Sequence, residues 1–120
     1  MAKNILVVDK TSFIRTTIKN NLSKAGYNVI AEAGDGRKAI EQFIIHNPDL
    51  VVMETQLPEV DGIEALKVMR QVNPDVPVVM CSNAGQQTVV LEAFKAGAKD
   101  FLVKPIQTDR LIETVKQYIG

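Results

Sequence analysis

Five short apolar runs alternate with five amphipathic stretches along the chain, and this alternation limits the possible folds more than any other feature. The runs are rich in β-branched residues and lie at 5–8, 29–31, 50–53, 76–80 and 101–103. Continuous apolar strands are typical of a sheet that is buried on both faces. Between the runs, apolar residues recur every three or four positions, as in Ile14, Ile18 and Leu22, and this spacing predicts helices with one buried face.

Strands that alternate with helices predict a parallel sheet joined by right-handed crossovers. The turns agree with this division, because Ser12, Asp35 and Thr108 suit helix N-caps, and Gly26 and Gly97 fall where helices should end. We therefore predict a single α/β domain over residues 1–120, a flavodoxin-like (βα)5 doubly wound sheet with strand order 2-1-3-4-5. A closed eight-stranded barrel would need about twice this length.

Composition narrows the classes of partner. Lys plus Arg and Asp plus Glu each number 14, so the net charge is zero, whereas nucleic acid and anionic membranes favour a basic surface. No apolar stretch approaches the roughly 18 residues needed to span a bilayer, and the first residues do not form a signal peptide. The single cysteine, Cys81, favours a reducing, cytoplasmic setting. We expect a monomer with neither nucleic acid nor membrane as its partner.

Polar residues follow four of the predicted strands. In open α/β sheets, ligands bind beyond the carboxyl ends of the strands, at the switch point, which lies here between strands 1 and 3. The residues at those ends are Asp9-Lys10, Glu54, Cys81-Ser82-Asn83 and Lys104-Pro105. Because clustered charges are costly without a purpose, their convergence on one edge indicates a functional site.

These strand ends belong to longer motifs. They are the segments 5–9, 48–53, 57–62 and 96–105, together with the hydroxyl residue Ser82. With them the chain resembles the receiver domains of two-component response regulators, of the CheY type, over essentially its whole length. The segment 81–87 and the lack of a second domain resemble the stand-alone receivers of chemotaxis.

The resemblance implies a role for each matching position. In this family an aspartate after strand 3 accepts a phosphoryl group, and phosphoryl transfer depends mainly on charge neutralisation and positioning. Asp9 matches an acid that holds Mg²⁺, and Glu54 and the backbone carbonyl of Gln56 stand at two other metal-ligand positions. Ser82 and Lys104 match the residues that bind the phosphoryl oxygens. The alternative for Ser82 is a turn residue without a role in the site.

Two positions depart from the family pattern. The acceptor position holds Glu54, and the second metal-binding acid is replaced by Lys10. Two acids and two lysines leave the site neutral, and each unit charge pair at 4 Å is worth about 4 kcal/mol at an effective dielectric of 20. We therefore expect weak Mg²⁺ binding and no other cofactor.

Glu54 also places its carboxylate about 1.5 Å further out than an aspartate would. A misplacement of about 1 Å can cost on the order of a hundredfold in a positioned reaction. The hypothesis is a receiver that is impaired in phosphorylation or constitutively biased by an ion pair between Lys10 and Glu54. Two alternatives stay open: a receiver still phosphorylated with Mg²⁺, and a Lys10 that is simply a solvated loop lysine.

The resemblance also implies an output surface on the fourth helix, the fifth strand and the fifth helix. The residues expected there are Gln86, Gln87, Lys95, Lys99, Phe101 and Thr108. Phe101 matches the family's aromatic switch position and could equally be a core residue. The implied partners are a histidine kinase, the flagellar motor switch or another effector.

Two other functional classes fit the sequence poorly. A flavin-binding redox protein of this fold needs a glycine- and hydroxyl-rich phosphate loop after strand 1, but residues 9–13 contain no glycine and the chain has no tryptophan. A hydrolase needs a placed base, and the single histidine, His46, is expected at the opposite end of the sheet. We therefore predict no enzymatic activity beyond weak autophosphorylation or autodephosphorylation.

Overall fold

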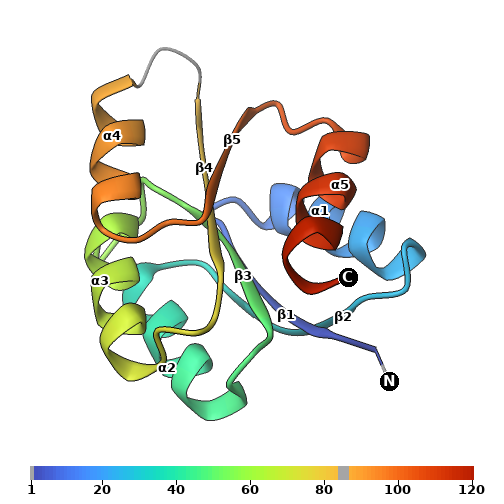
Figure 1. The fold of residues 1–120 in the computed structure, drawn as a ribbon, viewed down its shortest axis with the longest axis horizontal. Coiled ribbons are helices and arrows are strands. Elements are labelled where there is room, and N and C mark those ends of the chain that lie inside the picture. Colours follow the sequence, from blue (N-terminus) through green and yellow to red (C-terminus); the bar gives the residue numbers. More distant parts are fainter. Residues whose placement is uncertain (1, 84–86) are drawn as a thin grey trace.

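A computed structural model describes residues 2–83 and 87–120 as five strands and five helices that alternate along the chain (Figure 1). The elements are β1 (Asn4–Val8), α1 (Ser12–Lys24), β2 (Asn28–Ala33), α2 (Gly36–His46), β3 (Leu50–Glu54), α3 (Gly62–Val72), β4 (Val78–Asn83), α4 (Gln87–Lys95), β5 (Asp100–Lys104) and α5 (Thr108–Ile119). All strand pairs are parallel and the order is β2-β1-β3-β4-β5, which confirms the predicted fold. None of the described helices is long and apolar enough to cross a membrane.

The sheet separates two hydrophobic cores. Helices α1 and α5 cover one face, and α2, α3 and α4 cover the other (Figure 1). Side chains alternate along each strand, so Ile5 and Val7 of β1 pack beneath α1 and α5, whereas Leu6 and Val8 pack on the opposite face. Both faces of the central strands are therefore buried, which explains their uninterrupted apolar sequences.

Strand β4 differs from its predicted limits. The apolar run predicted a strand over 76–80, but β4 begins at Val78 and continues to Asn83. Pro77 has no N–H to give to the sheet, so the strand begins after it. Cys81 and Ser82 are paired with Leu102 and Val103 of β5, and they lie within the strand rather than after it.

The helix ends partly confirm the predicted caps. Asp35 caps α2 by accepting the backbone N–H of Lys38 at 2.8 Å. Ser12 and Thr108 are instead the first residues of their helices, and the residues before them make no side-chain cap. Gly26 and Gly97 have φ values of +94° and +110°, the left-handed conformation expected after a helix.

The loop from 55 to 61 is held at its base by Gly62 and in its interior by Gly36. Gly36 donates its N–H to the carbonyl of Pro58 at 3.1 Å, and Gly62 donates to the carbonyl of Thr55 at 2.8 Å. A Cβ atom at Gly36 would overlap the Val60 carbonyl, and one at Gly62 would overlap backbone carbonyls at the end of β3. Only glycine permits this close approach.

Candidate functional site

Three charged residues meet at the carboxyl edge of the sheet. Asp9 directly follows β1, Glu54 ends β3 and Lys104 ends β5. Each continues the alternation of the side chains that pack beneath α1 and α5, namely Ile5, Val7, Leu50, Val52 and Leu102. Strand alternation therefore aims all three side chains to the same side of the sheet.

Lys104 lies between the two acids and binds both. Its Nζ donates to Asp9 Oδ2 at 2.7 Å and to Glu54 Oε2 at 2.8 Å. The Lys104 side chain is only 11% exposed, and those of Asp9 and Glu54 are 2% and 6% exposed. We refer to Asp9, Glu54 and Lys104 as the charge cluster.

Backbone amides bind the remaining two carboxylate oxygens. The N–H of Thr11 donates to Asp9 Oδ1 at 2.9 Å, and the N–H of Lys10 donates to Glu54 Oε1 at 3.0 Å. All four carboxylate oxygens of the cluster thus have an N–H donor. This arrangement compensates both acids for the loss of water.

The Lys10 side chain contributes less to neutralising Glu54 than the sequence predicted. Its Nζ lies 3.8 Å from Glu54 Oε2, and the side chain is 46% exposed. Lys104 is 1 Å closer to the same oxygen and far more buried. The predicted pair between Lys10 and Glu54 is therefore present as a long contact, and Lys104 is the principal counter-ion of Glu54.

Arg15 braces the turn that carries Asp9, and the sequence reading missed it. Its Nη1 donates to the backbone carbonyl of Asp9 at 2.5 Å, and its Nε lies 3.4 Å from Glu32 Oε1 on β2. The one available signal was the spacing of six residues from Asp9, which places Arg15 on the first turn of α1. This bracing fixes where the amides of residues 10 and 11 point.

The cluster changes the acidity of two buried groups. Burial alone lowers the pKa of Lys104, but hydrogen bonds and charge from Asp9 and Glu54 outweigh it and raise the pKa above its ordinary value. Cys81 lies beneath the cluster, and burial raises the pKa of its thiol to about 12, with Lys104 opposing and the two acids adding to the rise. Lys104 therefore stays charged and Cys81 stays neutral and unreactive at physiological pH.

The residues of the site do not fit a divalent cation well. In the described residues, no three or more His, Cys, Asp and Glu side chains gather where they could hold a metal ion. Mg²⁺ requires oxygen ligands in octahedral geometry, but the acids here already bind an ammonium group and two amides. Lys104 also brings positive charge to the space between the two acids, which opposes the binding of a divalent cation.

Two further predicted site residues stand apart from the cluster. Ser82 is buried within β4, and alternation places it on the same face as Met80, opposite Cys81. Gln56 is exposed in the loop after β3. In residues 2–83 and 87–120, neither side chain makes a hydrogen bond to Asp9, Glu54 or Lys104, and the role predicted for the backbone carbonyl of Gln56 as a metal ligand stays a prediction.

The predicted output residues lie on α4, β5, α5 and the segment before β5. Gln87, Lys95, Lys99 and Thr108 are exposed, whereas Gln86 lies outside the described residues. Phe101 is half-buried and packs against the core beneath α2, α3 and α4. Three exposed apolar residues on the same elements were not predicted, namely Leu91, Phe94 and Val103.

Comparison with known proteins identifies the family. Residues 5–116 match the response regulator receiver domain, and the chain belongs to this family of two-component signalling modules. It is 48% identical to the chemotaxis protein CheY of Bacillus subtilis over the full length of both chains. It is 44% identical to the chemotaxis protein CheY of Thermotoga maritima over 98% of each.

Solved structures share the architecture. A putative response regulator from Chloroflexus aurantiacus superposes with a TM-score of 0.93 at 29% identity, over 98% of both chains. A complex of CheX and CheY with BeF3 and Mg²⁺ from Borrelia burgdorferi superposes with a TM-score of 0.92 at 28% identity, over 98% of this chain and 90% of that chain. The flavodoxin-like receiver fold predicted from the sequence is thereby confirmed.

Proposed function

We propose that this receiver acts in chemotaxis-type signalling through protein contacts. We also propose that its charge cluster, rather than phosphorylation, determines the signalling conformation of the domain. The observation that carries this proposal is the position of Lys104, which binds Asp9 and Glu54 simultaneously at 2.7 and 2.8 Å. Chemotaxis is the role named for the two CheY relatives, which match the chain over nearly its whole length.

The geometry disfavours Glu54 as a phosphoryl acceptor. The attacking carboxylate oxygen must be available, but Oε2 binds Lys104 and Oε1 binds the amide of Lys10. The transferred group also needs cations to neutralise its developing charge, and the positive charge of Lys104 between the two acids opposes the binding of a metal ion there. Transfer to Glu54 would therefore begin by opening a buried ion pair.

A phosphorylatable, Mg²⁺-dependent receiver is the second candidate. It is favoured by the Borrelia burgdorferi relative, whose structure contains BeF3 and Mg²⁺ on the same fold. Asp9 and Lys104 of this chain also match the family's pattern. The two candidates differ in whether a phosphoryl mimic can enter the site.

The partners in this proposal are signalling proteins in the cytoplasm. The exposed apolar residues Leu91, Phe94 and Val103 lie on α4 and β5, in the region where exposed Lys95 and Lys99 also lie. Apolar area beside positive charge suits a partner segment with apolar anchors and acidic neighbours. A histidine kinase and the flagellar motor switch are the two partner classes to test.

The deciding experiment is a ¹⁵N amide NMR titration with Mg²⁺, followed by beryllofluoride. We expect no saturable shifts at residues 9, 54 and 56 at millimolar Mg²⁺ and no response to beryllofluoride. The matched control is the double variant Lys10→Asp/Glu54→Asp, which restores the family's acids and should respond to both. Saturable wild-type shifts that extend to Phe101 and Lys104 would overturn the proposal in favour of the second candidate.

A further inference from the structure

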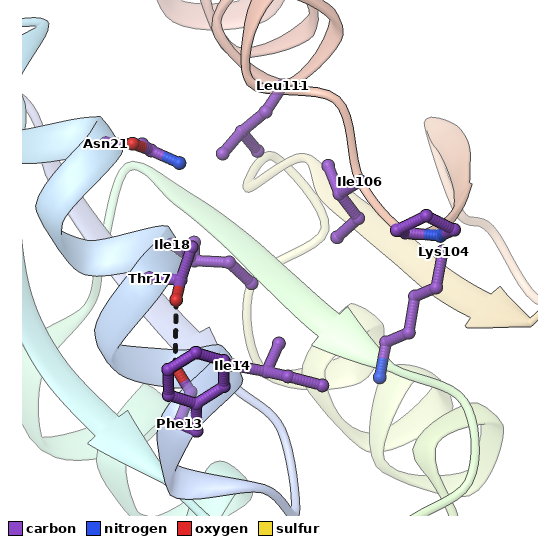
Figure 2. A pocket seen from close by; sticks show the side chains of 9 residues that line it. Phe13, Ile14, Thr17, Ile18, Asn21, Lys104, Ile106 and Leu111 are labelled. Atoms are coloured by element: carbon purple, nitrogen blue, oxygen red, sulfur yellow. Dashed lines mark hydrogen bonds between the residues drawn. The ribbon is translucent and has the colours of Figure 1, made fainter.

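An apolar crevice lies beside the charge cluster, between α1 and the segment that joins β5 to α5. Its volume is about 200 Å³. Figure 2 shows side chains from α1 facing those around residues 104–111 across it. The lining residues are Phe13, Ile14, Thr17, Ile18, Asn21, Lys104, Pro105, Ile106 and Leu111.

The size and walls of the crevice suit one small apolar group. An apolar cavity of roughly 150 Å³ can hold benzene, so a space of this size accepts one ring with a short substituent. The walls are mainly aliphatic, and Phe13, which is 77% exposed, stands at the crevice as an aromatic surface. Sites for small molecules are concave and mainly apolar, with a few polar groups that orient the ligand.

The crevice has a charged hydrogen-bond donor at one end, the ammonium group of Lys104. Lys104 carries three N–H groups and gives two of them to Asp9 and Glu54, and no acceptor for the third is found in the described part of the chain. Asn21 uses one N–H of its amide on the Thr108 hydroxyl at 3.1 Å. Thr17 donates its hydroxyl to the Phe13 carbonyl (Figure 2). An occupant should therefore bring an acceptor to the Lys104 end.

The positive charge of Lys10 allows a negatively charged acceptor to bind near Lys104. With an acid at position 10, Lys104 and the three acids around it would together carry a net charge of minus two and would repel an anion. With Lys10 they are neutral, and Glu54 has a second cation at 3.8 Å. An incoming carboxylate can therefore bind Lys104 while Glu54 remains with the amide and ammonium of residue 10.

We infer that this crevice binds a small aromatic carboxylate, which contacts Lys104 and loosens its bond to Glu54. The ring lies among the aliphatic walls and the carboxylate faces the ammonium group. Binding then changes the charge cluster without covalent chemistry, so the receiver responds to a small molecule. This inference goes beyond the proposed function and shares with it only the geometry of the cluster.

The test is an NMR titration of the whole chain with benzoate, benzyl alcohol and acetate. We expect saturable benzoate shifts at Ile14, Ile18, Ile106 and Leu111, together with residues 10 and 54. Benzyl alcohol, which has the ring without the charge, should bind at least tenfold more weakly, and acetate should not saturate. Absence of benzoate shifts at 10 mM, shifts confined to other surfaces, or equal affinity for benzoate and benzyl alcohol would each overturn the inference.

Variants separate the two parts of the interaction. Lys10→Asp should weaken benzoate binding at least tenfold and leave benzyl alcohol binding unchanged. Lys67→Asp makes the same change of charge on the exposed face of α3 and serves as the matched control, with no effect on either ligand. Ile106→Trp should fill the crevice and abolish both. Unchanged benzoate affinity in Lys10→Asp would contradict the inference.

The result is independent of the beryllofluoride experiment. A wild-type response to beryllofluoride without benzoate binding would reject both ideas. Benzoate binding with a beryllofluoride response would reject only the phosphorylation-independent function. If neither benzoate nor beryllofluoride changed the spectrum, the proposed function would stand and the crevice would be rejected as a carboxylate site.

Discussion

Two ion pairs of the molecule have the same length and opposite surroundings. Lys104 and Glu54 are 2.8 Å apart at the carboxyl edge of the sheet, with side chains 11% and 6% exposed. Arg37 and Glu41 are also 2.8 Å apart, one turn from each other on α2, with side chains 62% and 50% exposed. The first pair joins two strands, and the second joins neighbours on one helix.

The difference shows that environment rather than distance determines what an ion pair does. An exposed pair contributes about 0.3–0.5 kcal/mol on a helix and is screened by salt. Removing one partner of a buried pair costs about 3–5 kcal/mol, because the other charge is left without water or a counter-ion. The charge cluster is therefore a constraint on the fold as well as a candidate site.

The largest expected effect comes from Lys104→Met. This change leaves Asp9 and Glu54 buried together without their shared cation, and we expect a loss of about 3–5 kcal/mol in the free energy of unfolding at pH 7. Urea denaturation followed by circular dichroism measures it. A loss below about 1 kcal/mol would mean that the pair behaves like an exposed one.

Glu54→Gln tests one arm of the cluster with little change of volume. Lys104 keeps Asp9 as its partner, so the expected cost is smaller, about 1.5–3 kcal/mol, the range for a hydrogen bond to a charged group. The same denaturation experiment gives the value, with Glu41→Gln on α2 as the matched surface control. Equal losses of stability in Glu54→Gln and Glu41→Gln would mean that the ion pair of the charge cluster behaves like the exposed pair on α2.

The stability of the protein at high pH reports on the burial of Cys81 beneath the charge cluster. Because its pKa in the folded protein is about 12 against an ordinary 9.0, the unfolded chain loses the thiol proton first. Its contribution to stability is complete below pH 9.0 and should fall by about 1.4 kcal/mol per pH unit as the pH rises toward 12.

The measurement is the free energy of unfolding at pH 8, 9, 10 and 11, with Cys81→Ala as the comparison. Burial also raises the pKa values of Tyr27 and Tyr118, and these contribute in a neighbouring range. Both proteins keep these tyrosines, so the difference in slope isolates the thiol. Parallel curves would show that water reaches Cys81 and the cluster above it.

The smallest expected effect is that of Arg37→Ala. We expect a loss of about 0.3–0.5 kcal/mol in low salt, and none in 1 M NaCl, where the screening length is only about 3 Å. Paired denaturation curves at the two salt concentrations provide the test. The Lys104→Met effect should persist in 1 M NaCl, and its disappearance there would contradict the buried character of the cluster.

The order of the elements could be predicted because each level of the sequence agreed. The apolar runs, the helical spacing and turn residues such as Asp35 and Gly97 all indicated the same fold. The positions of Asp9, Glu54 and Lys104 at one edge followed from parallel strands, whose carboxyl ends lie together. The sheet therefore determined most of the site before any side chain was placed.

The details that could not be predicted depend on contacts between distant residues. The predicted pair between Lys10 and Glu54 is present at 3.8 Å, but the sequence did not show that Lys104, at the end of β5, lies nearer to the same oxygen while Lys10 lies on an exposed turn. Ser82 was placed after β4, but pairing with Val103 extends the strand past it. The crevice could not be predicted, because α1 and residues 104–111 form it only when packed together.

The close contacts of Gly36 and Gly62 with the 55–61 loop limit how the sequence of this site can change in evolution. Backbone contacts hold the loop at its base, through Gly62, and in its interior, through Gly36, while Gln56 and Glu59 within it are exposed. Inserted residues would have to break these contacts, whereas exchanged side chains would not. In a lineage of such domains, new chemistry beside residue 54 should therefore arise by substitution at constant loop length, with positions 36 and 62 the last to vary.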